Sequence, residues 1–193
     1  MDIAILKYNA GNVQSVIYAL QRLGIEPVLT DNEELLRKAD KVIFPGQGEA
    51  SSAMRYLRER KLDKLLLDLR QPVLGICIGQ QLMCRHSEEG NTECLGIFDL
   101  AVKKFPPKEK VPHMGWNRLE NMKTPLFKGL PKDPYVYYVH SYYCETGHAT
   151  IADSHYILPF SAALHKDNYY AIQAHPEKSG KDGAIILENF LSL

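Results

Sequence analysis

Short apolar runs alternate with amphipathic stretches along the first half of the chain. The runs at 3–6, 25–29, 41–44 and 73–76 predict buried strands. Between them, apolar residues recur at helical spacing over 12–23, where Gly24 marks the helix end, and over 51–69. A further helix is expected directly after Cys77. This alternation predicts an α/β fold, in which a mostly parallel sheet is covered by helices.

The second half has closely spaced strand-like runs that are rich in tyrosine and β-branched residues. They cover 135–144, 149–151, 161–164 and 169–174, and a last helix is expected over 181–193. Such spacing predicts antiparallel or mixed pairing. Because no linker or repeat divides the sequence, we expect one domain spanning residues 1–193.

Charge and composition narrow the classes of function. The chain carries 23 Lys and Arg against 23 Asp and Glu, so no overall field favours nucleic acid or an anionic membrane surface. No apolar stretch approaches the roughly 20 residues that cross a bilayer. The four cysteines form no CxxC pair, and 1–6 is interpreted as a buried strand instead of a secretory leader. A reducing cytoplasm is therefore expected.

The main candidate for chemistry is Cys77, which Gly75 and Gly79 flank where an apolar strand runs into a helix. A Gly-x-Cys-x-Gly turn projects the thiol from the strand end, and the helix N-terminus favours thiolate over thiol. In open sheets, sites form beyond the carboxyl ends of the strands. Taken alone, however, a free cysteine is more often an inert core residue.

His175 and Glu177 supply a possible base and its orienting group. They lie two residues apart, so in an extended segment both side chains share one face. A carboxylate beside an imidazole fixes its tautomer and stabilises the protonated ring. The combination with Cys77 predicts nucleophilic catalysis, whereas each residue alone does not.

The segment Pro45-Gly46-Gln47-Gly48 follows the third expected strand. It is either an ordinary turn or one side of an oxyanion hole, and the sequence favours neither. In the second interpretation, an amide near Gln47 or Gly48 acts together with the N–H of Ile78. The scattered histidines lack metal-ligand spacing, so no metal or cofactor is expected.

These residues resemble a known family. Gly75-Ile76-Cys77-Ile78-Gly79-Gln80-Gln81 resembles the nucleophile elbow of class I (triad) glutamine amidotransferases, and His175-Pro176-Glu177 resembles their second signature. Within that class, four further segments resemble the HisH family, the glutaminase subunits of imidazole glycerol phosphate synthase, so that the resemblance spans nearly the whole chain. The segments are 8–12, 45–48, 112–117 and 140–142.

The resemblance implies a three-layer αβα, flavodoxin-like fold with an antiparallel extension, and a role for each matching residue. Cys77, His175 and Glu177 would be the catalytic triad, with the oxyanion hole at Gly46, Gln47, Gly48 and Ile78. Glutamine would be bound by Gln81, Glu89, Ser141 and Tyr142. The residues implied to face a partner are Asn12, Met114, Trp116, Asn117, Tyr137 and Lys178.

The implied activity is hydrolysis of L-glutamine to glutamate and ammonia. Ammonia would pass to a HisF-type (β/α)₈ barrel synthase subunit, for formation of imidazole glycerol phosphate and AICAR in histidine biosynthesis. Three alternatives stay open: a paralogous glutaminase that feeds another synthase, such as a sugar amidotransferase; a non-catalytic binding module; and a cysteine peptidase or redox protein on the same architecture.

Two positions depart from the family's usual pattern. Gln47 stands where Pro-Gly-Val-Gly has valine, and Asn9 stands where Tyr-Gly-x-Gly-Asn has its first glycine. Glutamine can form hydrogen bonds that valine cannot, so Gln47 is expected to alter the resting orientation of the oxyanion segment. Neither departure removes a member of the triad.

Overall fold

A mixed sheet forms the centre of the protein. In this computed structural model, which describes residues 1–9 and 13–193, it has seven strands. Their spatial order is β11 (Thr150–Tyr156), β12 (Leu158–Lys166), β13 (Tyr169–Ile172), β4 (Val73–Ile76), β3 (Lys41–Phe44), β1 (Ile3–Leu6) and β2 (Val28–Thr30). Neighbours from β2 to β13 pair in parallel, whereas β12 and β11 extend the sheet antiparallel. The parallel part follows the flavodoxin-like order.

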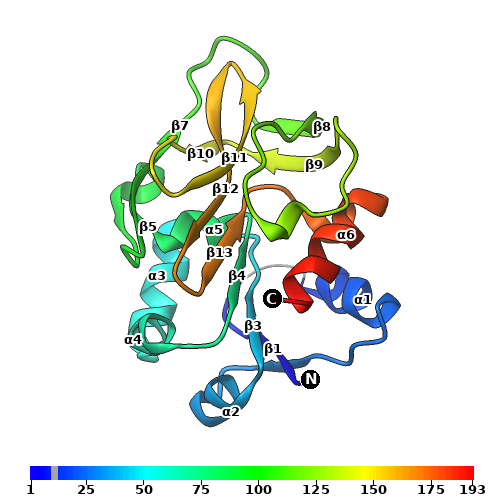
Figure 1. The fold of residues 1–193 in the computed structure, drawn as a ribbon. Coiled ribbons are helices and arrows are strands. Elements are labelled where there is room, and N and C mark those ends of the chain that lie inside the picture. Colours follow the sequence, from blue (N-terminus) through cyan, green and yellow to red (C-terminus); the bar gives the residue numbers. More distant parts are fainter. Residues whose placement is uncertain (10–12) are drawn as a thin grey trace.

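Helices cover both faces of this sheet (Figure 1). On one face lie α1 (Gln14–Arg22) and α6 (Gly180–Leu191), and on the other lie α2 (Glu33–Lys38), α3 (Ala50–Glu59), α4 (Leu62–Asp68) and α5 (Ile78–Met83). Each layer has its own apolar core: Leu20 and Phe190 are fully buried in the first, and Met54 and Leu82 in the second. The predicted α/β class is confirmed, with three layers.

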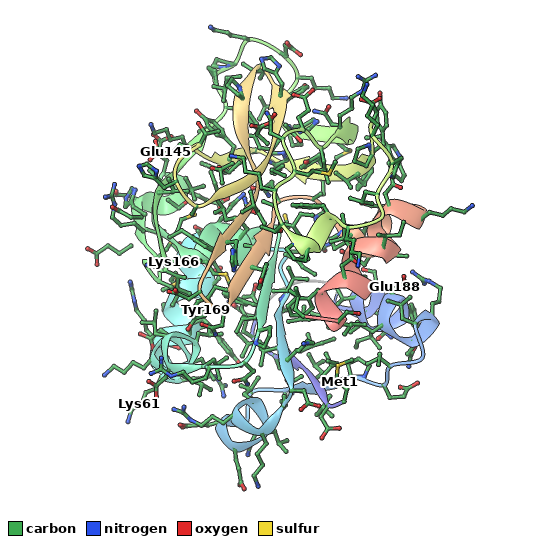
Figure 2. The ribbon with its side chains drawn as sticks, viewed as in Figure 1. Met1, Lys61, Glu145, Lys166, Tyr169 and Glu188 are labelled. Carbon is green, nitrogen blue, oxygen red and sulfur yellow. The ribbon has the colours of Figure 1, made fainter. Side chains whose placement is uncertain are left out.

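The single helix expected over 51–69 is wrong, because the chain breaks it into α3 and α4. Lys61 takes a left-handed conformation with φ of 59° and its side chain extends from the surface (Figure 2). Buried residues run through Leu57 in α3 and resume at Leu62 in α4, five positions later. One continuous helix of 3.6 residues per turn could not bury both sets on one face.

Other bounds also differ from expectation. The second strand begins at Val28, because Pro27 has no N–H to donate to a ladder. The run 135–144 divides at Ser141 into β9 (Tyr135–His140) and β10 (Tyr142–Cys144). The expected start of the first helix, at Asn12, lies outside the described residues, and the last helix spans 180–191.

Smaller sheets cover the end of the central sheet that carries Cys77. β9 pairs antiparallel with β8 (His113–Arg118), and β10 belongs to a sheet with β7 (Phe98–Lys104), β5 (Cys84–Ser87) and β6 (Thr92–Glu93). Three short 3₁₀ turns are described, at Glu89–Asn91, Pro125–Phe127 and Pro176–Lys178. Within 1–9 and 13–193, no helix is long and apolar enough to cross a membrane.

Candidate active site

Cys77 lies in a strained turn between β4 and α5. Its φ of 54° and ψ of −107° are unusual for a residue with a side chain, and its N–H donates to the Ile172 carbonyl at 2.8 Å. A Cβ on Gly79 would overlap the Phe44 carbonyl oxygen, and one on Gly75 would come within 2.9 Å of the Met83 sulfur. Both glycines are needed because α5 packs directly on the sheet.

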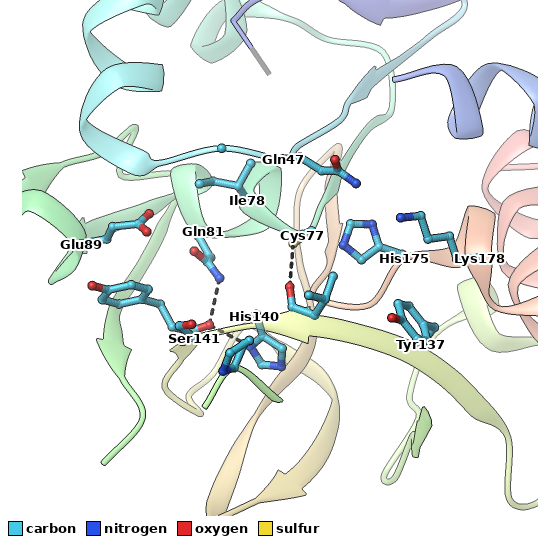
Figure 3. A pocket seen from close by; sticks show the side chains of 14 residues that line it. Gln47, Cys77, Ile78, Gln81, Glu89, Tyr137, His140, Ser141, His175 and Lys178 are labelled. Atoms are coloured by element: carbon cyan, nitrogen blue, oxygen red, sulfur yellow. Dashed lines mark hydrogen bonds between the residues drawn. The ribbon is translucent and has the colours of Figure 1, made fainter. Parts of the chain in front are cut away.

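His175 and Glu177 form a buried pair. The imidazole Nδ1–H donates to Glu177 Oε1 at 2.8 Å, and the two side chains are only 2% and 3% exposed. Pro176–Lys178 forms a 3₁₀ turn, so the expected extended segment is replaced by a turn that still joins the two groups. Since a carboxylate only accepts, Nδ1 carries a proton and Nε2 is left for Cys77. Figure 3 shows the imidazole beside the thiol.

The surroundings of His175 favour its protonated form. Burial lowers the pKa of the imidazole, but the neighbouring Cys77 and Glu177 raise it, with a net result of about 10. His175 Nε2 has no hydrogen-bond partner among the described residues. A buried imidazolium next to a sulfur can both stabilise a thiolate and deliver a proton.

The backbone of His175 is fixed to β9. Its N–H donates to the Tyr137 carbonyl at 2.9 Å. The buried Ser179 hydroxyl donates to the His175 carbonyl at 2.6 Å and accepts from the Tyr137 N–H at 2.9 Å. Strand β9 therefore fixes the backbone from which the imidazole ring projects.

A pocket of about 540 Å³ opens in front of Cys77 and His175. Most of the candidate residues line it (Figure 3): Gln47, Gly48, Cys77, Ile78, Gln81, Glu89, Tyr137, Ser141, Tyr142, His175 and Lys178. Glu177 lies outside the lining, bonded to His175. Gly46 also lies outside it, packed so closely on Ile78 that a Cβ would overlap the Ile78 side chain.

The segment after β3 is tied down at its start. Tyr8 donates its hydroxyl proton to the Pro45 carbonyl at 2.5 Å, and burial raises the pKa of this phenol, which keeps it a donor. Gly48 has a φ of 146°, in the range that favours glycine. Because α5 begins at Ile78, the N–H of Ile78 is among the amides that a helix leaves unpaired. Gly48 and Ile78 both line the pocket.

The candidate glutamine-binding residues already have contacts within the protein. Gln81 Nε2 donates to the Tyr142 carbonyl and to Gln173 Oε1, each at 2.9 Å. Glu89 Oε2 accepts from the Ala50 N–H at 2.8 Å. Burial raises the pKa of Glu89, although this hydrogen bond opposes it.

Only some of the residues expected to face a partner lie on one exposed surface. Met114 and Trp116 on β8 are 61% and 55% exposed, and Trp116 contacts the Tyr137 ring edge-on. Asn117 lies on the opposite face of β8, where its amide donates to the His155 carbonyl at 3.0 Å. Lys178 lines the pocket. Asn12 lies outside the described residues.

Several residues of the site have no counterpart among the sequence candidates. Gln173 is fully buried, with Nε2 3.6 Å from Cys77 Sγ. It stands two residues before His175, so period-two alternation would have placed the two on one face, but its contact with Cys77 depends on the pairing of β13 with β4. His140 donates from Nδ1 to the Tyr142 carbonyl at 2.8 Å and accepts from His113. Burial is the main factor that lowers the pKa of His113 to about 4 and of His140 to about 3.

Within the described ranges, no group of three or more His, Cys, Asp or Glu side chains could hold a metal ion.

Comparison with known proteins identifies the class. Residues 4–193 match the family model described as "Glutamine amidotransferase class-I". The fold resembles a crystal structure titled "glutamine amidotransferase" (TM-score 0.77, 20% identity, 98% of this chain and 97% of that chain). It also resembles a putative GMP synthase subunit from Thermoplasma acidophilum (TM-score 0.76, 21% identity, 100% and 92%). The chain is a class I glutamine amidotransferase, and thus an enzyme.

More similar proteins identify the family within this class. The chain is 60% identical over 196 residues to the imidazole glycerol phosphate synthase subunit HisH of Bacteroides fragilis strain YCH46, and 44% identical to that of Yersinia pseudotuberculosis, with full coverage of all chains. The Haemophilus influenzae strain Rd subunit is 42% identical over 99% of this chain and 97% of its own. The chain belongs to the HisH family.

Proposed function

We propose that this chain is the glutaminase subunit of a cytoplasmic imidazole glycerol phosphate synthase and acts through Cys77, His175 and Glu177. The observation that carries the proposal is the buried His175–Glu177 pair, bonded at 2.8 Å, beside a cysteine in a strained turn at a helix N-terminus. A nucleophile, a proton carrier and a group that orients it are therefore adjacent, at the wall of a pocket large enough for an amino acid.

In the first step, the Cys77 thiolate attacks the side-chain amide carbon of glutamine. The carbonyl oxygen becomes negative and accepts hydrogen bonds from backbone amides near Gly48 and Ile78. When the C–N bond breaks, protonated His175 donates its Nε2 proton to the leaving nitrogen, which departs as ammonia and leaves a γ-glutamyl thioester.

In the second step, His175 is neutral and removes a proton from a water molecule that attacks the thioester. The C–S bond then breaks, which releases glutamate and restores the thiolate with a protonated imidazole. Glu177 keeps the Nδ1 proton in place throughout, so only Nε2 exchanges protons. Gln81 and Glu89 contact the amino-acid part of the substrate, and Ser141 and Tyr142 line the pocket around it.

The ammonia passes to a HisF-type (β/α)₈ barrel subunit, which uses it to form imidazole glycerol phosphate and AICAR. The exposed Met114 and Trp116 side chains support a docking face beside the site, because Trp116 contacts Tyr137, which lines the pocket together with Lys178. Direct transfer has a chemical reason, because free ammonia is protonated and lost in bulk water.

A coupled assay tests the proposal. The chain is mixed with its barrel partner and the ribonucleotide substrate of that partner, and product formation with glutamine is compared with that from ammonium salt. We expect glutamine to support synthesis, and the barrel with its ligand to raise a low basal glutaminase rate. Product from ammonium salt but not from glutamine would refute the assignment, and equal glutaminase rates with and without the barrel would refute the coupling.

A further inference from the structure

Gln173 lies between the nucleophile and one of the candidate glutamine-binding residues. It is fully buried; its Oε1 accepts from Gln81 Nε2 at 2.9 Å, and its Nε2 lies 3.6 Å from Cys77 Sγ. The triad mechanism gives this side chain no part. A buried amide that contacts the reacting sulfur needs a role of its own.

The direction of these hydrogen bonds follows from one fixed acceptor. The Tyr142 backbone carbonyl can only accept, so Gln81 must present its NH₂ group to it, and the same NH₂ group faces Gln173. The atom of Gln173 that faces Gln81 must then be the oxygen. The NH₂ group of Gln173 consequently faces the Cys77 sulfur, since a flipped amide would set two donors against each other.

We propose that Gln173 is a positioning residue that donates a hydrogen bond to the Cys77 sulfur, favours its thiolate form and couples it to Gln81. The proposal rests on the proposed function, in which Cys77 is the nucleophile. Cys77 is only 8% exposed, so water solvates its sulfur poorly. A thiolate there needs hydrogen-bond donors from the protein in place of water. Gln173 supplies a donor whose orientation the neighbouring Gln81 fixes.

The chain offers a matched control in Gln80. This glutamine is also fully buried, but its Nε2 donates to the Ser161 carbonyl at 3.0 Å. Replacing either glutamine by methionine removes a buried amide of similar size. Only the replacement at 173 removes a donor to Cys77.

The experiment follows alkylation of Cys77 by iodoacetamide in the full chain, without glutamine. Peptide mass spectrometry separates Cys77 from the other three cysteines, and the rate is measured from pH 5 to 10. We expect Gln173→Met to react about tenfold more slowly at neutral pH and to reach its half-maximal rate about one pH unit higher, the effect of losing a hydrogen bond to a charged group. Gln80→Met should follow the wild-type profile.

Two further measurements keep the test decisive if Gln173→Met fails to fold. Gln173→Glu retains the acceptor for Gln81 but places a carboxylate against the sulfur, so its profile should move further toward high pH. In the wild type, the side-chain ¹⁵N amide resonance of Gln173 should titrate with the alkylation profile, and this titration should vanish in Cys77→Ala.

Wild-type and Gln173→Met profiles that superimpose, or an equal shift in Gln80→Met, would overturn the inference, as would a Gln173 resonance that ignores the state of Cys77. The readout needs no glutamine turnover. If only the proposed function were wrong, the variants would still show the expected alkylation profiles, but the chain would not hydrolyse glutamine.

Discussion

Replacing Glu177 by glutamine should nearly abolish glutaminase activity while leaving the shape of the site intact. The carboxylate lies 2.8 Å from Nδ1 of His175, and both side chains are almost inaccessible to water. An amide oxygen facing the ring would no longer stabilise the imidazolium. An amide nitrogen facing it would force the proton onto Nε2, the atom that must exchange protons with substrate.

The expected size of the loss follows from this geometry. A buried hydrogen bond to a charged group contributes about 1.5–3 kcal/mol, which alone corresponds to roughly 10- to 100-fold in rate. Loss of the correct tautomer adds to it, and the comparable change in a serine triad lowers kcat by about 10⁴-fold. We therefore expect kcat to fall on the order of 10³- to 10⁴-fold for Glu177→Gln, with little change in KM.

The assay measures glutamate release by the chain together with the proposed barrel subunit. Asp182→Asn serves as the control, because it removes one carboxylate from the neighbouring helix α6, where Asp182 accepts from the Tyr135 N–H instead. That variant should stay within about twofold of wild type. A Glu177→Gln enzyme within tenfold of wild type, or an equal loss in the control, would refute the reasoning.

Three other changes have defined outcomes. Gly79→Ala should cost about 1–3 kcal/mol in denaturant unfolding, because its Cβ overlaps the Phe44 carbonyl oxygen, and unchanged unfolding would contradict the packing. The free energy of unfolding should decrease as pH falls from about 6.5 to 4 or below. His113 and His140 stay neutral in the folded protein over this range, whereas the same histidines take up protons in the unfolded chain. Replacing both by glutamine should flatten this part of the stability–pH curve. Trp116→Ala should leave unfolding within about 0.5 kcal/mol but weaken binding of the barrel subunit by roughly 30-fold or more in a titration; unchanged affinity would place the docking face elsewhere.

The strands that the sequence predicted best are those buried on both faces. Residues 3–6 and 73–76 contain no polar side chain, 41–44 has three apolar residues after Lys41, and the structure gives all three strands the expected bounds. Their pattern is unambiguous because central strands of a parallel sheet meet helices on either side. The break at Lys61 was missed because Arg60 and Lys61 are good helix formers. Only the shift in phase between Leu57 and Leu62 marks it.

The parts of the site that could be predicted are those formed by residues close together in the sequence. Gly75 and Gly79 around Cys77 indicated the turn because the backbone there requires them. Contacts between residues far apart in the sequence were harder to predict. The amide of Gln173 meets Cys77 only because β13 lies next to β4, and Asn117 proved to face away from Met114 once the pairing of β8 was known.

The most direct measurement of the central claim is labelling with a γ-electrophilic glutamine analogue, followed by mass spectrometry of the digested chain. We expect one adduct per chain, on Cys77, that excess glutamine prevents and that His175→Ala forms far more slowly. An adduct on another residue, or labelling of Cys77 that glutamine does not suppress, would contradict the claim.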